Sequence, residues 1–226
     1  MSSARQDILG RIRRALAVPA PRPGHDPGHH SAPLKAAEEA RRVLPPVGPE
    51  PSDWLDLFRS NAADLHAEFH ELDGTAAAGK FIAALARDEG WERIASHHSE
   101  LCDAALSSFP LPIQWAEEAA GASFEPCAAG VTACDFLVAQ TGSVVVTSRS
   151  AGGRALSVLP PHHIVIARRN QLVPDLPTAM DALAAHYGNQ WPSMTGFITG
   201  PSRTGDIERI LVLGAHGPKR LTILMV

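Results

Sequence analysis

The sequence predicts an α/β protein built on an open, mainly parallel sheet with helices on both faces. Short apolar, β-branched runs alternate with helical patterns from about residue 52 onward, which is the order expected when helices connect parallel strands. Apolar residues make up 45% of the chain and charged residues 19%, so one sizeable core can be buried. Two runs around a Gln-Thr-Gly-Ser turn add one antiparallel hairpin.

The chain divides into three predicted parts. Residues 1–18 form a short basic amphipathic helix, whose apolar residues recur at helical spacing: Ile8, Leu9, Ile12 and Leu16. Such a helix can bind membranes, but the narrow stripe without large aromatics favours docking against protein. Residues 19–33 are rich in Pro, Gly and His and are expected to be a flexible linker. Residues 34–226 are expected to form a single α/β domain.

The order of elements in that domain follows from periodicity and from breaker residues. A long helix is expected to begin at Ser52 and end at Gly74, because apolar residues recur every three or four positions. The other predicted helices cover 34–44, 75–87, 100–107, 177–187 and 202–213. The predicted strands cover 93–96, 111–115, 136–139, 144–147, 163–167, 194–199 and 221–225.

Charge and targeting signals narrow the class of protein. The net charge is −4 and the isoelectric point is about 6.2, so the chain lacks the basic surface that nucleic acid requires. Its apolar runs are too short to span a bilayer, and its first residues do not form a signal peptide. We therefore expect a cytoplasmic protein with neither a nucleic-acid partner nor a membrane span.

The cysteines predict neither disulfides nor a resident cluster. The chain has three, Cys102, Cys127 and Cys134, and no pair has the C-x-x-C spacing. An iron–sulfur cluster usually takes four thiolates, so we expect the chain to lack a cluster of its own. The three cysteines are expected to be small buried residues. Ligand spacing indicates no metal site either, and the sequence assigns no cofactor.

A loop rich in small and polar residues is the clearest candidate site. It runs from Thr199 to Glu208, between a predicted strand and a predicted helix, where ligands bind in open α/β sheets. Glycines let a ligand approach, and a helix N-terminus favours an anion. The predicted anion-binding residues are Gly200, Ser202, Arg203 and Thr204. The alternative is that Ser202 or Thr204 only caps the helix and that Asp206 answers its dipole.

Three other segments offer candidate site residues. Thr141, Gly142 and Ser143 form the hairpin turn, and Arg154 could be a second anion-binding cation. His162 and His163 should point to opposite faces of a strand, so at most one faces a site, and His162 is the candidate. His216, between glycines, is the best-placed histidine for acid–base work. It is the candidate catalytic residue together with Asp206.

The order of these segments resembles one family. The chain carries T-G-S at 141–143, R-x-x-S-x-L-P-x-H at 154–162, G-P-S-R-T-x-D-I-E at 200–208 and G-x-H-G-P at 214–218. This order is similar to the LUD-domain family of the lactate utilisation protein C type, over about residues 130–226. The resemblance implies a fold like that of sugar-phosphate isomerases and coenzyme A transferases. It also implies a role in oxidising L-lactate to pyruvate, alongside separate iron–sulfur subunits.

The resemblance leaves the activity open, because one fold supports many functions. Our leading hypothesis is a cytoplasmic subunit of an L-lactate utilisation system that binds a small carboxylate or an anionic cofactor. A second hypothesis is a stand-alone coenzyme A transferase-like or cyclo-ligase-like enzyme acting on an anionic substrate. A third is a non-catalytic assembly or regulatory subunit. Whether the chain is itself an enzyme is left undecided at this point.

Overall fold

The computed structural model describes residues 2–17, 46–118, 124–204, 212–214 and 216–226. The chain forms two units, Met1–Leu44 and Pro45–Val226. The first unit contains helix α1 (Ser2–Ala17), on which Ile8, Leu9 and Ile12 are exposed. The predicted linker 19–33 and the predicted helix 34–44 lie outside the described residues, so the three-part division stays a prediction.

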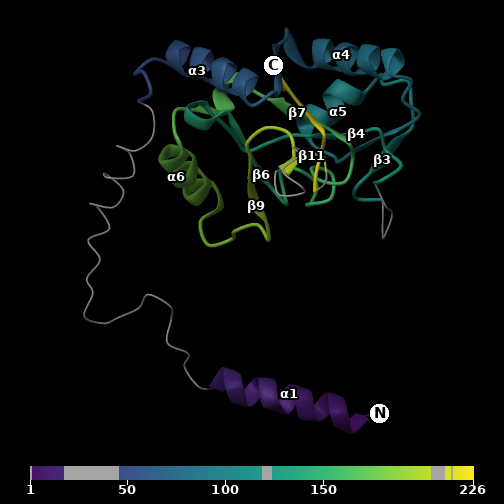
Figure 1. The fold of residues 1–226 in the computed structure, drawn as a ribbon, viewed down its shortest axis with the longest axis vertical. Coiled ribbons are helices and arrows are strands. Elements are labelled where there is room, and N and C mark those ends of the chain that lie inside the picture. The colour runs from purple at the N-terminus through teal and green to yellow at the C-terminus, as the bar shows by residue number, and fades with distance from the viewer. Residues whose placement is uncertain (1, 18–45, 119–123, 205–211, 215) are drawn as a thin grey trace. The chain divides into compact units, whose positions relative to one another are not determined.

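A six-stranded sheet organises the second unit (Figure 1). Its strand order is β1-β12-β7-β4-β2-β3, and every neighbouring pair is parallel. The strands are β1 (Glu68–Glu71), β12 (Arg220–Met225), β7 (His162–Ala167), β4 (Ala129–Thr132), β2 (Ile94–Ser96) and β3 (Ile113–Trp115). The predicted open parallel sheet is therefore confirmed. Strands β7 and β12 each have a neighbour on both sides, as expected of apolar, β-branched runs.

Helices cover both faces of this sheet, as predicted. On one face, α4 (Gly74–Asp88) and α5 (Glu100–Leu106) pack against a cluster that includes Ile164 and Leu224. On the other face, α3 (Pro51–Asp64) packs against a cluster that includes Val165 and Ile223. Successive strand residues thus alternate between two cores. Ser99 caps α5 by accepting a hydrogen bond from the Cys102 amide at 3.2 Å.

A second, four-stranded sheet lies on the α3 side, where its strands β5 and β6 share the α3 core. Its order is β8-β5-β6-β9, with strands β8 (Leu172–Val173), β5 (Phe136–Val138), β6 (Ser143–Thr147) and β9 (Thr195–Ile198). The predicted hairpin is confirmed, since β5 and β6 are antiparallel. A 3-10 turn (Ala139–Thr141) joins them, and Gly142 adopts a left-handed φ of 62°. Helix α6 (Leu176–Tyr187) packs on this sheet.

The predicted long helix from Ser52 to Gly74 is wrong. Helix α3 begins at Pro51 and ends at Asp64, and His66, at φ 61°, turns the chain into strand β1. Phe69, which fits the helical spacing, lies in β1, paired with Ile223 of β12. Pairing at the sheet edge therefore overrode the local helical pattern.

The predicted helix 202–213 is also wrong over its described residues. Arg203–Thr204 form strand β10, which pairs antiparallel with β11 (Val212–Leu213). The Gly214 amide donates to the Ser202 carbonyl at 3.0 Å, so extended pairing continues past β11. Gly214, at φ 76°, is therefore a turn residue and not a helix cap. No helix within the described ranges is long and apolar enough to cross a membrane.

Candidate functional site

The carboxyl ends of the parallel strands meet at one edge of the large sheet, where open α/β sheets place their ligand sites. Strand β4 leads there into Cys134 and Asp135, and β7 leads into Arg168. A hollow of about 550 Å³, which we call the carboxyl-edge hollow, opens beside them. Its size is usual for small-molecule sites. Its lining is Cys134, Asp135, Phe136, Arg149, Ser150, Arg168, Asn170, Gln171, His186 and Tyr187.

The Asp135 carboxylate is held by two hydroxyl groups in this hollow. Tyr187 Oη donates to Oδ1 at 2.5 Å, and Ser150 Oγ donates to Oδ2 at 2.5 Å. Tyr187 Oη also contacts Thr147 Oγ1 at 3.0 Å. Burial and the bond to Asp135 raise the pKa of Tyr187, so the phenol keeps its proton. These contacts fix the carboxylate in one orientation.

Three elements position this network. Gln171 Nε2 donates to the carbonyls of Cys134 and Asp135 at 2.6 and 3.1 Å, which fixes the loop after β4. Tyr187 ends α6, whose buried residues Ala179 and Leu183 pack on the second sheet. Ser150 lies in the turn after β6. The hollow therefore joins the carboxyl edge of the large sheet to the smaller sheet and its helix.

Two arginines bring positive charge to the hollow. The Arg149 guanidinium carbon lies 5.4 Å from the centre of the Tyr187 ring, a cation–π contact. Among the described residues, Arg149 forms no ion pair. Arg168 pairs with Glu100 at 2.7 Å, but that glutamate side chain is 85% exposed, and exposed pairs are weak. Both guanidinium groups could therefore bind an anionic ligand.

The predicted residues Thr141 and Ser143 lie at a different hollow. Their hydroxyls are 2.7 Å apart, and Ser143 Oγ lies 2.8 Å from Thr199 Oγ1. The three residues line a hollow of about 380 Å³ together with Leu176, Met180 and Phe197. Gly142 faces away from it: a Cβ there would lie 2.9 Å from Cβ of Asn61 in α3. Close packing on α3 therefore explains this glycine.

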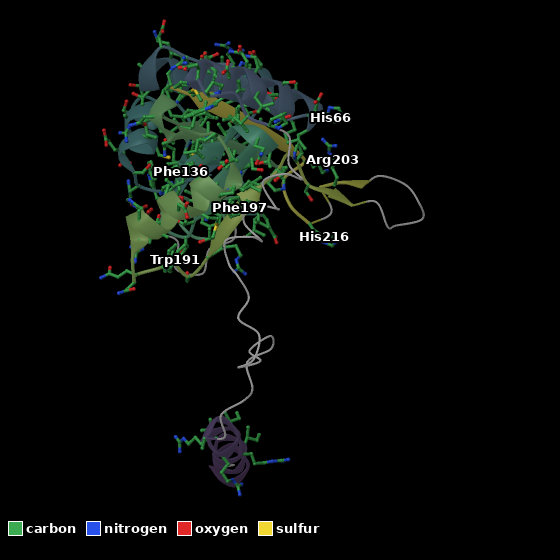
Figure 2. All side chains as sticks on the ribbon, turned by 90° about the vertical axis from the view of Figure 1, so that its left-hand side faces the viewer. His66, Phe136, Trp191, Phe197, Arg203 and His216 are labelled. Carbon is green, nitrogen blue, oxygen red and sulfur yellow. The ribbon has the colours of Figure 1, made fainter. Side chains whose placement is uncertain are left out.

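Gly200 and Arg203 meet at the carboxyl end of α3. Arg203 donates to the carbonyl of Leu65, the C-cap residue, and lies beside His66 in Figure 2. A Cβ on Gly200 would lie 3.0 Å from the same carbonyl oxygen. The carboxyl end of a helix favours cations, so this position suits Arg203 but disfavours an anion. Thr204 is described only as a backbone position in β10.

Backbone hydrogen bonds bring Ser202 close to the segment 214–218. The Ser202 amide donates to the Pro218 carbonyl at 2.8 Å, and the Gly214 amide donates to the Ser202 carbonyl. The His216 side chain is exposed, and Figure 2 shows it together with Arg203 near β10. Asp206 lies outside the described residues. A ligand-binding role for these residues stays a prediction.

Arg154 and His162 lie away from the carboxyl-edge hollow. Arg154 is exposed, and its carbonyl accepts a hydrogen bond from Ser157 Oγ at 3.1 Å. His162 opens β7 at the amino end of the large sheet and is buried there. Its partner is Thr222 Oγ1 of β12, which lies 2.8 Å from Nε2.

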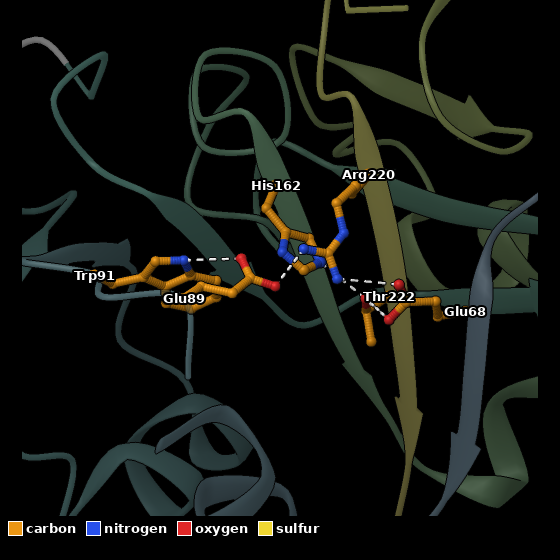
Figure 3. A network of polar contacts seen from close by, with 6 residues as sticks. All are labelled: Glu68, Glu89, Trp91, His162, Arg220 and Thr222. Carbon is orange, nitrogen blue, oxygen red and sulfur yellow. Dashed lines mark hydrogen bonds and ion pairs between the residues drawn. The ribbon is translucent and has the colours of Figure 1, made fainter. Parts of the chain in front are cut away.

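A polar network surrounds His162 (Figure 3). Arg220 pairs with Glu68 at 3.0 Å and with Glu89, and Thr222 donates to Glu68 at 3.0 Å. Trp91 donates to Glu89 at 3.1 Å, and its ring meets His162 edge-on. Burial, then the Arg220 charge, lower the pKa of His162 to about 4. This histidine is therefore neutral at pH 7, and the network around it links β1, β7 and β12 to the residues that follow α4.

His163 points to the other face of β7, as strand alternation predicted. Its Nε2 lies 2.9 Å from Thr132 Oγ1 of β4, and burial lowers its pKa to about 3. The three cysteines are buried and free, as predicted, and burial raises their pKa values. The described residues contain no group of three or more potential metal ligands.

Sequence reasoning missed the residues of the carboxyl-edge hollow: Asp135, Arg149, Ser150, Arg168 and Tyr187. Strand β4 was not predicted, because Ala129–Thr132 contains only one large apolar residue. Without β4, Asp135 could not be placed at a strand's carboxyl end. One signal was available: Tyr187 is the only tyrosine of the chain and ends a predicted helix.

Comparison with known proteins gives consistent results over most of the chain. The model of the LUD domain matches residues 55–226. Lactate utilization protein C of Bacillus subtilis (strain 168) is 27% identical over 233 residues, 96% of this chain and 91% of that protein. Lactate utilization protein C of Halalkalibacterium halodurans is 40% identical over 99 residues, 43% of each chain.

A solved structure shares the fold. It is the crystal structure of a DUF162 family protein from Deinococcus radiodurans, which superposes with a TM-score of 0.60 at 22% identity. The superposition covers 79% of this chain and 99% of that one. At this identity the likeness concerns the fold alone.

Proposed function

The chain belongs to the LUD domain family, and we propose that it serves in lactate utilisation as a subunit that binds a small carboxylate or an anionic cofactor. The names of the two relatives described above support the lactate role. We place the ligand in the carboxyl-edge hollow. The observation that carries this placement is Arg149, a cation without an ion-pair partner among the described residues, beside the fixed Asp135 carboxylate.

Charge and geometry favour this hollow over the segment 200–204. Arg149 and Arg168 can present planar, forked donors to a carboxylate. Arg203 already donates to the Leu65 carbonyl at the end of α3, where the helix dipole opposes an anion. Binding at Arg203 would therefore require breaking that contact, whereas Arg149 would give up only a cation–π contact.

We further propose that iron–sulfur subunits carry the electrons released from lactate. The support is the cysteine content: three thiols without cluster spacing, each buried in this structure. The chain would then hold or present an anion to those partners in the cytoplasm. Neither nucleic acid nor a lipid bilayer has a place in this proposal.

Isothermal titration calorimetry with L-lactate, pyruvate and inorganic phosphate tests the site. We expect at least one of these anions to bind, and Arg149→Ala to weaken that binding by about tenfold, the usual loss for a charged hydrogen bond. Arg87→Ala is the matched control, because Arg87 is 76% exposed near the end of α4, outside the hollow. It should bind like the wild type.

Arg203→Ala tests the rival location. If it weakens binding and Arg149→Ala does not, the ligand lies at the segment 200–204 and the placement in the carboxyl-edge hollow is wrong. If none of the three anions binds the wild type, the proposed binding function itself fails. Melting temperatures of all variants, measured without ligand, separate loss of binding from loss of folding.

A further inference from the structure

We propose that the carboxyl-edge hollow selects 2-hydroxy acids over the 2-oxo acids with the same carbon skeleton, with Asp135 as the residue that recognises the hydroxyl group. This inference rests on the proposed function, because it names the ligand class of the same hollow. It follows from the direction of the hydrogen bonds that end at Asp135.

Backbone amides set the direction of this hydrogen-bond chain, because they can only donate. Thr147 Oγ1 faces the amides of Arg149 and Ser150, at 3.3 and 3.2 Å. It therefore accepts from the backbone, and its own hydroxyl donates to Ser150 Oγ at 3.3 Å. The Tyr187 hydroxyl lies 3.0 Å from Thr147 Oγ1 and donates its proton to Asp135 Oδ1.

Ser150 brings a second donor by the same logic. The amide of Thr147 donates to Ser150 Oγ at 2.9 Å, which leaves the serine proton for Asp135 Oδ2. Both carboxylate oxygens thus accept a hydrogen bond from a neighbouring hydroxyl. Asp135, which lines the hollow, presents the remaining lone pairs of its two oxygens as acceptors for a ligand.

A ligand must satisfy both charge types in the hollow. Its carboxylate suits Arg149 and Arg168, and the atom that meets Asp135 must carry a donor. The hydroxyl of a 2-hydroxy acid supplies that donor on the carbon next to the carboxylate. The oxo group of a 2-oxo acid brings an acceptor against the acceptor oxygens of Asp135, so the two repel and no hydrogen bond forms between them.

The hollow also admits ligands longer than lactate. Its volume of about 550 Å³ leaves room beyond a three-carbon acid, so the same preference should hold along a series. Discrimination based on a missing donor is stronger than discrimination based on one methylene group. The hydroxyl, and not the chain length, should therefore dominate selectivity.

Calorimetric titration of the wild-type chain with matched acids tests the inference. The pairs are L-lactate with pyruvate and L-2-hydroxybutyrate with 2-oxobutyrate. We expect each hydroxy acid to bind about tenfold or more tightly than its oxo partner. Asp135→Asn places an amide donor beside the ligand, so its preference should fall to near equality or invert.

Tyr187→Phe is the matched variant, because it removes one donor to Asp135 but keeps the carboxylate. It should retain the preference for hydroxy acids. Equal affinities within both wild-type pairs would overturn the inference and leave the anion site standing. Retention of the full preference in a folded Asp135→Asn variant would overturn it as well. Absence of binding by all four acids would instead count against the proposed function.

Discussion

Lowering the pH should destabilise this protein through its buried histidines well before its carboxylates protonate. His162 has a pKa of about 4 in the folded chain, and His163 has a pKa of about 3, against an ordinary value of 6.5. Both pKa values are depressed, so between pH 6.5 and about 4 the unfolded chain binds protons that the folded chain excludes. Stability is therefore complete above pH 6.5 and falls as the pH decreases through this window.

The loss in unfolding free energy depends only on the pKa of the histidine in the unfolded chain, provided that its pKa in the folded chain stays well below the measured pH. Lowering the pH from about 7.5 to about 5.5 removes about 1.4 kcal/mol for each such histidine. The two together lower the free energy of unfolding by about 2–3 kcal/mol. Burial lowers the pKa of His97 as well, so this histidine adds to the loss. The bond to Asp103 raises the pKa of His98, but His98 is exposed and its effect is small.

Urea unfolding monitored by tryptophan fluorescence measures this dependence, and Trp91 lies against His162 as a local probe. The slope of the unfolding free energy against pH should reach about two protons between about pH 6 and pH 5 from His162 and His163, with a further contribution from His97. His162→Gln removes one titrating group, so its slope should fall by about one proton. A free energy that stays flat across this range would mean that both histidines ionise freely in the folded chain, and the reasoning would be refuted.

Two further predictions concern backbone packing and the division of the chain. Gly130→Ala would place a Cβ 2.2 Å from the Leu156 carbonyl oxygen, so we expect a loss of about 1–3 kcal/mol or more in urea unfolding. The control is Gly196→Ala, whose Cβ would meet no atom closer than 3.6 Å; similar losses in both variants would refute the packing argument. Deletion of residues 1–33 should leave a cooperative thermal melt, because the Pro- and Gly-rich segment separates the helix from the body. Insoluble expression of the truncated chain would place that helix in the core.

Local signals predicted the strands with the strongest apolar, β-branched pattern. Strands β7 and β12 and the β5–β6 hairpin are apolar and rich in β-branched residues, so their pattern is visible without any partner. The errors arose where long-range pairing decides. Phe69 fits a helical stripe as well as it fits β1, and only the pairing with β12 selects the strand. Ser202 resembles a helix cap, yet its amide and carbonyl bond to Pro218 and Gly214.

The carboxyl-edge hollow was harder to predict than the fold because its contacts span long stretches of sequence. Tyr187 lies 52 residues from Asp135 in the chain, and no spacing rule connects a helix end to the loop after an unpredicted strand. The sequence motifs instead predicted ligand-binding sites at glycines. Gly142 and Gly200 have a common structural cause, since both allow close approach to the end of α3. Their presence therefore indicates packing before it indicates a ligand.

The amino edge and the carboxyl edge of the large sheet differ in how far the protein neutralises its own charges. At the amino edge, Arg220 has two carboxylate partners and His162 is buried and neutral, so the charges are already satisfied within the protein. At the carboxyl edge, Arg149 has no such partner among the described residues, and Asp135 accepts only from neutral hydroxyls. A charge that the protein does not neutralise itself gains most from a ligand of opposite charge. The carboxyl edge is therefore where an anion would lower the free energy of the folded protein, and where its effect on stability should be measured first.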